Sequence, residues 1–206
     1  MLKFKSKKIK ITFKIDFNSI FNLKIESADL VNEENENMNG AIGKVQFVFE
    51  KQYFSVFIYF KNGNVDSKIN EKTPIYIAFN EKRPIIGKAA LEIYSKKPQF
   101  VVFDLIKLCS ISNSDIINPK WGFKLENDEN ESIMVIFETS EGPRRSKIEF
   151  LLALILKKGL ENISKNGIGK DVDKIEIGFN GIELNEILKK NFINAGKLLK
   201  TDIVFV

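Results

Sequence analysis

Hydrophobic and polar residues alternate over several stretches in the first two-thirds of the chain, as they do in β-strands that bury one face. Between residues 9 and 15, isoleucine and phenylalanine alternate with lysine and threonine, which predicts a half-buried strand. The segment 44–60 predicts a β-hairpin, because two alternating arms flank the turn Glu50-Lys51-Gln52. Within each arm the larger apolar side chains share one face: Val45, Phe47 and Phe49 in the first, and Phe54, Val56, Ile58 and Phe60 in the second.

Weaker patterns predict further elements between residues 22 and 139. The predicted strands are 22–31, 74–79, 100–108 and the two arms of a second hairpin, 121–125 and 132–139, which flank the turn 126–131. Residues 84–94 fit a strand or a helix, and both assignments stay open. The polar segments 32–40 and 110–119 are predicted loops.

The last third changes to helical periodicity. Ser146 and Glu149 have the Ser-x-x-Glu spacing of a capping box and open a Leu-rich helix over 148–160. This helix is apolar nearly all round, which predicts burial, and it would end at Gly159 or at Asn166-Gly167. A strand at 174–179, an amphipathic helix at 184–199 and a strand at 201–206 follow. The order strand, helix, strand predicts a right-handed crossover in which the last two strands are parallel.

These patterns together predict an α+β fold. Its β-rich N-terminal two-thirds would consist of antiparallel strands and hairpins, followed by a C-terminal α-β-α-β segment. We expect a single domain over residues 1–206. A candidate sub-boundary near residues 140–146 would separate a β-rich part, 1–140, from an αβαβ part, 146–206.

The chain contains no histidine and a single cysteine, Cys109. Ser-His-Asp triads, Cys-His pairs and imidazole general bases are therefore excluded. One cysteine can form neither an internal disulfide nor a Cys-rich metal site. We therefore expect no catalytic activity and no cofactor.

Magnesium chemistry based on carboxylates needs no histidine and stays open as an alternative. The acidic residues that could serve it are Asp171, Asp173 and Glu176, beside Lys170 and Lys174, and Asp66, beside Lys68. Neither group has the strand-borne Asp…Glu-x-Lys arrangement of a metal-dependent nuclease. Solvated turns in a chain with 29% charged residues explain both groups as well.

The net charge favours a polyanionic partner. The formal charge is +5 and the isoelectric point is about 9.1, values that suit nucleic acid as a ligand. Only three of the 32 basic residues are arginine, and lysine, asparagine, isoleucine and phenylalanine dominate the sequence. Because an A+T-rich genome imposes the same bias, the lysines alone do not define a binding surface, and the arginines are the more informative cations.

The first candidate surface is the segment Gly142-Pro143-Arg144-Arg145-Ser146-Lys147 at the predicted start of the Leu-rich helix. Free backbone N–H groups and the helix dipole favour an anion at a helix N-terminus. Arg144, Arg145 and Lys147 would add phosphate contacts, those of arginine being bidentate. The alternative is a capped turn with solvated cations.

The second candidate surface is a lysine stripe near the N-terminus. Lys8, Lys10 and Lys14 share the polar face of the strand predicted at 9–15 and could follow a phosphate backbone. The alternative is an edge strand on which lysine prevents aggregation.

The third candidate surface is the face of the first hairpin that carries Tyr53, Phe57 and Tyr59. Aromatic rings on an open sheet face can stack with bases. The alternative is two-sided burial, in which these rings pack under helices or against a partner chain.

We expect a soluble, cytoplasmic protein, because no apolar stretch approaches the ~20 residues of a membrane helix and no signal-peptide pattern is visible. We expect it to act by binding, as a subunit or accessory factor of a larger intracellular assembly, with nucleic acid ranked first among its ligands. A protein–protein or structural role, in a cellular or viral assembly or as a homo-oligomer, is the second hypothesis. A magnesium-dependent nuclease is the third.

Overall fold

The computed structural model describes residues 9–15, 21–27, 42–61, 65–66, 71–130, 132–165 and 172–206. Contacts divide the chain into two units, Met1–Ala41 and Ile42–Val206. The single-domain organisation stays a prediction. The α+β class is confirmed, with antiparallel strands early in the chain and the longest helices late.

The first unit contains an antiparallel pair of strands, β1 (Ile9–Ile15) and β2 (Phe21–Ser27). Ile9 lies opposite Ser27, and Ile15 lies opposite Phe21. The strand predicted at 9–15 is confirmed. The strand predicted at 22–31 is confirmed over residues 22–27, which belong to β2, and its remainder, 28–31, lies outside the described residues, as does the loop predicted at 32–40.

The second unit is built on a mixed sheet. Its strands are β3 (Ile42–Glu50), β4 (Tyr53–Phe60), β5 (Val65–Asp66), β6 (Thr73–Pro74), β13 (Lys174–Phe179) and β14 (Asp202–Phe205), in the order β14-β13-β3-β4-β5 with β6 also on β4. The predicted hairpin 44–60 is confirmed as β3 and β4, which pair antiparallel around Lys51 and Gln52. The predicted parallel pairing of the last two strands is also confirmed, and β13 is parallel to β3 as well.

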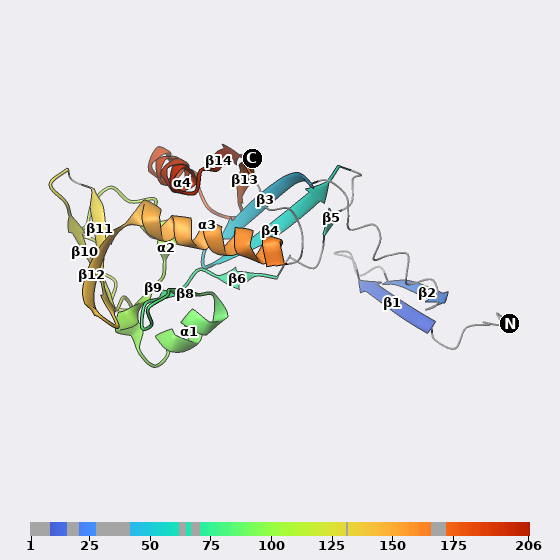
Figure 1. Ribbon diagram of the computed structural model, residues 1–206, viewed down its shortest axis with the longest axis horizontal. Helices are drawn as coiled ribbons and strands as arrows, with labels where there is room; N and C mark the ends of the chain where they lie inside the picture. The colour runs from blue at the N-terminus through green and yellow to red at the C-terminus, as the bar shows by residue number, and fades with distance from the viewer. Residues whose placement is uncertain are drawn as a thin grey trace. The chain divides into compact units, whose positions relative to one another are not determined.

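Two helices cover one face of this sheet, α3 (Ile148–Lys165) and α4 (Glu186–Leu199) (Figure 1). Phe47 and Phe49 of β3 are fully buried beneath them. The ring of Phe192 from α4 meets the ring of Phe49 edge-on, with 5.0 Å between the centroids. Of the two predicted helix ends, Gly159 is wrong, because it is an interior residue of α3 that brings the helix close to the Phe47 ring. The other, Asn166-Gly167, lies outside the described residues.

A small second sheet, β8-β7-β9, is formed by β7 (Ile77–Ala78), β8 (Ile85–Ile86) and β9 (Val101–Val102). The ambiguity at 84–94 resolves into both structures, because β8 is followed by α1 (Lys88–Tyr94) after Gly87, whose φ is +92°. The strand predicted at 74–79 is divided between β6 and β7.

The strand predicted at 100–108 is confirmed only at Val101 and Val102, which form β9. The chain leaves β9, adopts a left-handed conformation at Asp104 (φ +58°) and enters the short helix α2 (Leu105–Leu108). The Asp104 carboxylate accepts hydrogen bonds from the Trp121 indole N–H, at 2.8 Å, and from the Asn118 amide, at 3.2 Å. These tertiary hydrogen bonds hold the turn that an apolar pattern alone cannot reveal.

A third sheet contains the predicted second hairpin, as β10 (Lys124–Asn127) and β11 (Ile133–Thr139), and adds β12 (Gly142–Lys147). The helix predicted from residue 148 is confirmed at its start, but the capping box predicted at Ser146 and Glu149 and the turn considered for 142–147 are wrong. These residues form a strand that pairs with β11 and continues directly into α3. Ser146 lies opposite Val135, and its hydroxyl donates to the Lys147 carbonyl oxygen at 3.1 Å.

Candidate functional site

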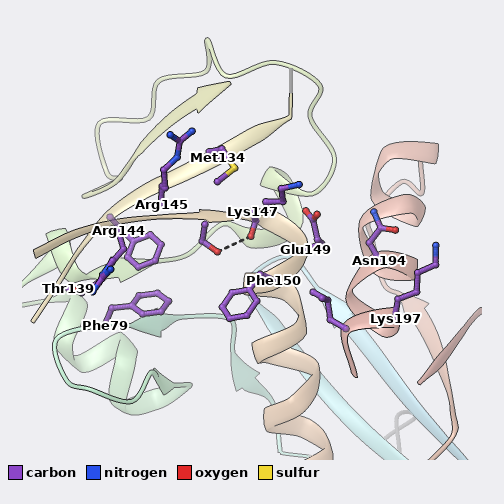
Figure 2. Close-up of a pocket in the computed structure, with 13 residues that line it drawn as sticks. Phe79, Met134, Thr139, Arg144, Arg145, Lys147, Glu149, Phe150, Asn194 and Lys197 are labelled. Carbon is purple, nitrogen blue, oxygen red and sulfur yellow. Dashed lines mark hydrogen bonds between the residues drawn. The ribbon is translucent and has the colours of Figure 1, made fainter. Parts of the chain in front are cut away.

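A cleft of about 790 Å³ lies between β11, β12, the start of α3 and the last turns of α4. Three of the residues predicted to bind anions, Arg144, Arg145 and Lys147, line it. Figure 2 shows that Lys197 and Asn194 approach the same cleft from α4. The structure thus brings cations from two elements, about 50 residues apart in the sequence, to one hollow.

The floor of the cleft is apolar. The rings of Phe79 and Phe137 stack, with 4.2 Å between their centroids. Phe150 and Leu198 line the same cleft and are 51% and 55% exposed. Large apolar side chains that stay exposed in a concave site are typical of a surface that binds a ligand.

The cations on the rim are exposed and weakly engaged. Arg144 forms an ion pair with Glu141 at 3.2 Å, but both side chains are about 60% exposed, so the pair contributes little. Among the described residues, no carboxylate lies within ion-pair distance of Arg145, Lys147 or Lys197. These ammonium and guanidinium groups are therefore able to contact an anionic ligand.

One carboxylate outside the lining of the cleft, Asp128, is affected by the cations of β12. Hydrogen bonds from the Ser132 and Asn130 backbone lower the pKa of Asp128, and the charges of Lys147 and Arg145 lower it further. Glu149 is the one carboxylate among the residues that line the cleft, against four cations. The excess of positive charge suits a ligand that carries several negative charges.

Strand β12, and not the predicted helix N-terminus, determines where the side chains of Arg144 and Arg145 point. Arg144 lies opposite Phe137 and Arg145 lies opposite Ile136. Because successive side chains of a strand point to opposite faces, Arg144 and Arg145 leave β12 in different directions. In Figure 2 the Arg145 side chain extends away from the Phe79 and Phe150 rings, so it belongs to the rim rather than to the floor.

The predicted lysine stripe belongs to the first unit. Lys10 and Lys14 lie on β1, opposite Glu26 and Asn22, and Lys8 lies outside the described residues. The cleft is lined entirely from the second unit. The role of the stripe in anion binding stays a prediction.

The predicted aromatic surface lies on the sheet face opposite α3 and α4. Tyr53 is 41% exposed, whereas Phe57 and Tyr59 are half-buried. The Tyr59 hydroxyl donates to Gln46 at 3.1 Å, and the Lys44 ammonium lies 4.6 Å from the centre of the Tyr59 ring. One side of this ring is thus already occupied by a cation. Base stacking and packing against a partner both stay predictions here.

The carboxylates considered for magnesium binding are not gathered by the described structure. Glu176 forms an ion pair with Lys44 at 2.9 Å, and Asp173 is exposed at the start of β13. Asp171, Lys170 and Lys68 lie outside the described residues. Within the described part of the chain, no group of three or more acidic, histidine or cysteine residues could hold a metal ion.

Cys109 is fully buried, and burial raises the pKa of its thiol. A thiol in this state is a poor nucleophile. Cys109 directly follows α2 in the chain and packs in the hydrophobic core as a small apolar residue.

Phe79, Phe150, Leu198 and Lys197 were not singled out by the sequence, although they complete the cleft. Phe150 belongs to a helix whose sequence predicts burial all round, so no local signal marks its exposure. Every helix in the described part of the chain is too short or too polar to span a bilayer. The sequence matches no protein-family model and none of the curated proteins.

Proposed function

We propose that this protein binds nucleic acid in the cleft between β12, α3 and α4, as a non-catalytic subunit or accessory factor of a larger assembly. The observation that carries the proposal is that four cations, Arg144, Arg145, Lys147 and Lys197, line one cleft whose floor is apolar. Two of the chain's three arginines contribute to it.

The chemistry of the cleft suits both parts of a nucleotide. Guanidinium groups bind phosphate oxygens in a bidentate manner, and each neutralised phosphate releases condensed counterions. The exposed ring of Phe150 offers a face on which a base can stack, an interaction that is tolerant of sequence. We therefore expect binding with strong salt dependence and little base preference.

The first test measures binding of a fluorescein-labelled oligonucleotide by anisotropy. Replacement of both arginines, Arg144→Ala/Arg145→Ala, should weaken binding at least about tenfold and reduce the salt slope by about 0.7 for each lost phosphate contact. The matched control is Lys96→Ala/Lys97→Ala, which removes two exposed adjacent cations outside the cleft. Affinity that ignores salt, or that falls equally in both variants, would contradict the proposal.

A protein partner is the second candidate, favoured by the exposed apolar side chains Phe150 and Leu198. If this cleft holds a second copy of the chain, Phe150→Ser/Leu198→Ser should convert an oligomer into a monomer. Sedimentation of the purified, nuclease-treated protein distinguishes a second copy of the chain from nucleic acid as the ligand of the cleft. An oligomer that the two serine substitutions dissociate supports the second copy, whereas a monomer is compatible with nucleic acid as the ligand.

A further inference from the structure

Two smaller hollows lie near the cleft, and shared lining residues link the three in series. A hollow of about 170 Å³ shares Phe79, Thr139 and Arg144 with the cleft and is also lined by Pro84. A third hollow, of about 450 Å³, shares Pro84 with the second. Hollows that share lining residues adjoin one another, and we consider the three together as one candidate groove.

The groove follows one stripe of α3. Phe150 lines the first hollow, and Leu154, Lys157 and Glu161 line the third. These positions are spaced by 4, 3 and 4 residues, which places them on one face of a helix. From Phe150 to Glu161 the helix rises about 16 Å. The groove is therefore elongated along the helix axis.

Cations occur along the whole groove. The lining cations are Arg144, Arg145, Lys147 and Lys197 in the first hollow, Lys82 in the second, and Arg83, Lys157 and Lys158 in the third. The carboxylates are Glu149, Glu81, Glu141 and Glu161. All three arginines of the chain are in this set, although 29 of its 32 cations are lysine.

The third hollow is as available to an anion as the first. Within the described part of the chain, no carboxylate lies within ion-pair distance of Arg83, Lys157 or Lys158. Arg83 and Lys157 are exposed and Lys158 is half-buried. The two ends of the groove differ in one respect, because the large exposed apolar side chains, Phe150 and Leu198, belong to the first hollow.

We infer that the groove is a track for a single strand of nucleic acid that lies extended along α3. The inference rests on the proposed function. It adds that the nucleic acid is single-stranded and that the third hollow contacts it as well as the first. Phe150 stacks with an unpaired base in the first hollow, and Arg83, Lys157 and Lys158 hold phosphates at the other end.

A single strand fits this arrangement better than a duplex or an acidic protein segment. The bases of a duplex are stacked inside the helix and cannot reach an apolar floor, whereas those of a single strand can. An acidic amphipathic segment needs large apolar contacts along its length. Of the residues that line the groove, Phe150 and Leu198 are the large apolar side chains that are exposed, and both belong to the first hollow, whereas Ile86 and Leu154 of the third hollow are half-buried. A nucleic-acid backbone carries one negative phosphate for each nucleotide, and this regular charge matches the cations that line the whole groove.

The test combines oligonucleotide length with two variants of the full chain. The oligonucleotides have about 4 and about 16 nucleotides, the range of site sizes known for single-strand grooves. Arg83→Ala/Lys157→Ala/Lys158→Ala should weaken binding of the long strand at least about tenfold and leave the short strand unchanged. Arg144→Ala/Arg145→Ala should weaken both. Lys96→Ala/Lys97→Ala/Lys120→Ala is the matched control, and circular dichroism verifies that every variant is folded.

The outcomes separate this inference from the proposed function. If Arg144→Ala/Arg145→Ala weakens binding of both oligonucleotides but Arg83→Ala/Lys157→Ala/Lys158→Ala weakens binding of neither, the inferred track along α3 is wrong and the proposed function stands. If Arg144→Ala/Arg145→Ala changes the affinity for neither oligonucleotide, the proposed function is wrong. A duplex of equal length that binds as tightly as the long strand, or a polyglutamate peptide that displaces it as efficiently as an unlabelled strand, would overturn the inference.

Discussion

Gly159 lies in the middle of α3, where glycine weakens a helix by about 1 kcal/mol relative to alanine. Its benefit is a close approach between the helix and the sheet. A Cβ atom at this position would lie 2.2 Å from Cε1 of Phe47 and 3.2 Å from Cγ2 of Val56. The missing side chain therefore sets the distance between α3 and the hairpin β3–β4.

Gly159→Ala should destabilise the protein although alanine is the better helix former. Overpacking of a core costs about 1–3 kcal/mol, which exceeds the gain in helix propensity, and we expect a net loss of about 1 kcal/mol in the free energy of unfolding. Urea denaturation measures this loss. The cost of Gly159→Ala should be smaller when it is measured in a Phe47→Leu background, because that substitution removes the ring that the new methyl group meets. A Gly159→Ala protein as stable as the parent would contradict the close packing.

Asp104 is a second residue that acts through contacts with residues distant in the sequence. Its left-handed backbone and its hydrogen bonds to Trp121 and Asn118 end β9 and start α2. Asparagine tolerates the left-handed region and retains one acceptor oxygen, whereas alanine does neither.

Asp104→Ala should destabilise the protein by about 1–3 kcal/mol, because the half-buried Trp121 and Asn118 lose their acceptor. Asp104→Asn should lose less. Trp121 is the only tryptophan, so its fluorescence reports the change directly. We expect a shifted emission maximum in the alanine variant. An unchanged emission together with unchanged thermal stability would show that the carboxylate does not hold this turn.

At the scale of elements, the long periodic segments were predictable and the short ones were not. The strand at 174–179 and the hairpin at 44–60 were predicted correctly, because alternation over six or more residues determines which face is buried. Strands of two residues, such as β7 and β9, have no period to detect. Their positions depend on pairing with each other rather than on local sequence.

β12 is the element that most changes the candidate site. Its six residues are mostly exposed and polar, so no hydrophobic alternation marks them as a strand. Only the pairing with β11 reveals it. Arg144 and Arg145 therefore belong to a strand that continues directly into α3, and not to a turn at the start of the helix.

At the scale of the whole second unit, the sequence indicated the chemistry of the cleft but not its shape. Arg144, Arg145 and Lys147 stand out because arginine is rare in this chain. Lys197 joins them only because α4 packs beside α3 against the same sheet face (Figure 1). No periodicity predicts which residues of two distant segments meet, since that depends on the packing of helices on the sheet.

The central claim, that nucleic acid binds in the cleft and along α3, is tested most directly by photocrosslinking. A strand that carries 4-thiouridine is irradiated on the full-length protein, and the crosslinked peptides are identified by mass spectrometry. We expect crosslinks at Phe150 and in peptides that contain Arg83 or Lys157. Crosslinks confined to Tyr53, Phe57 and Tyr59 of β4, or the absence of any crosslink at saturating strand, would contradict the claim.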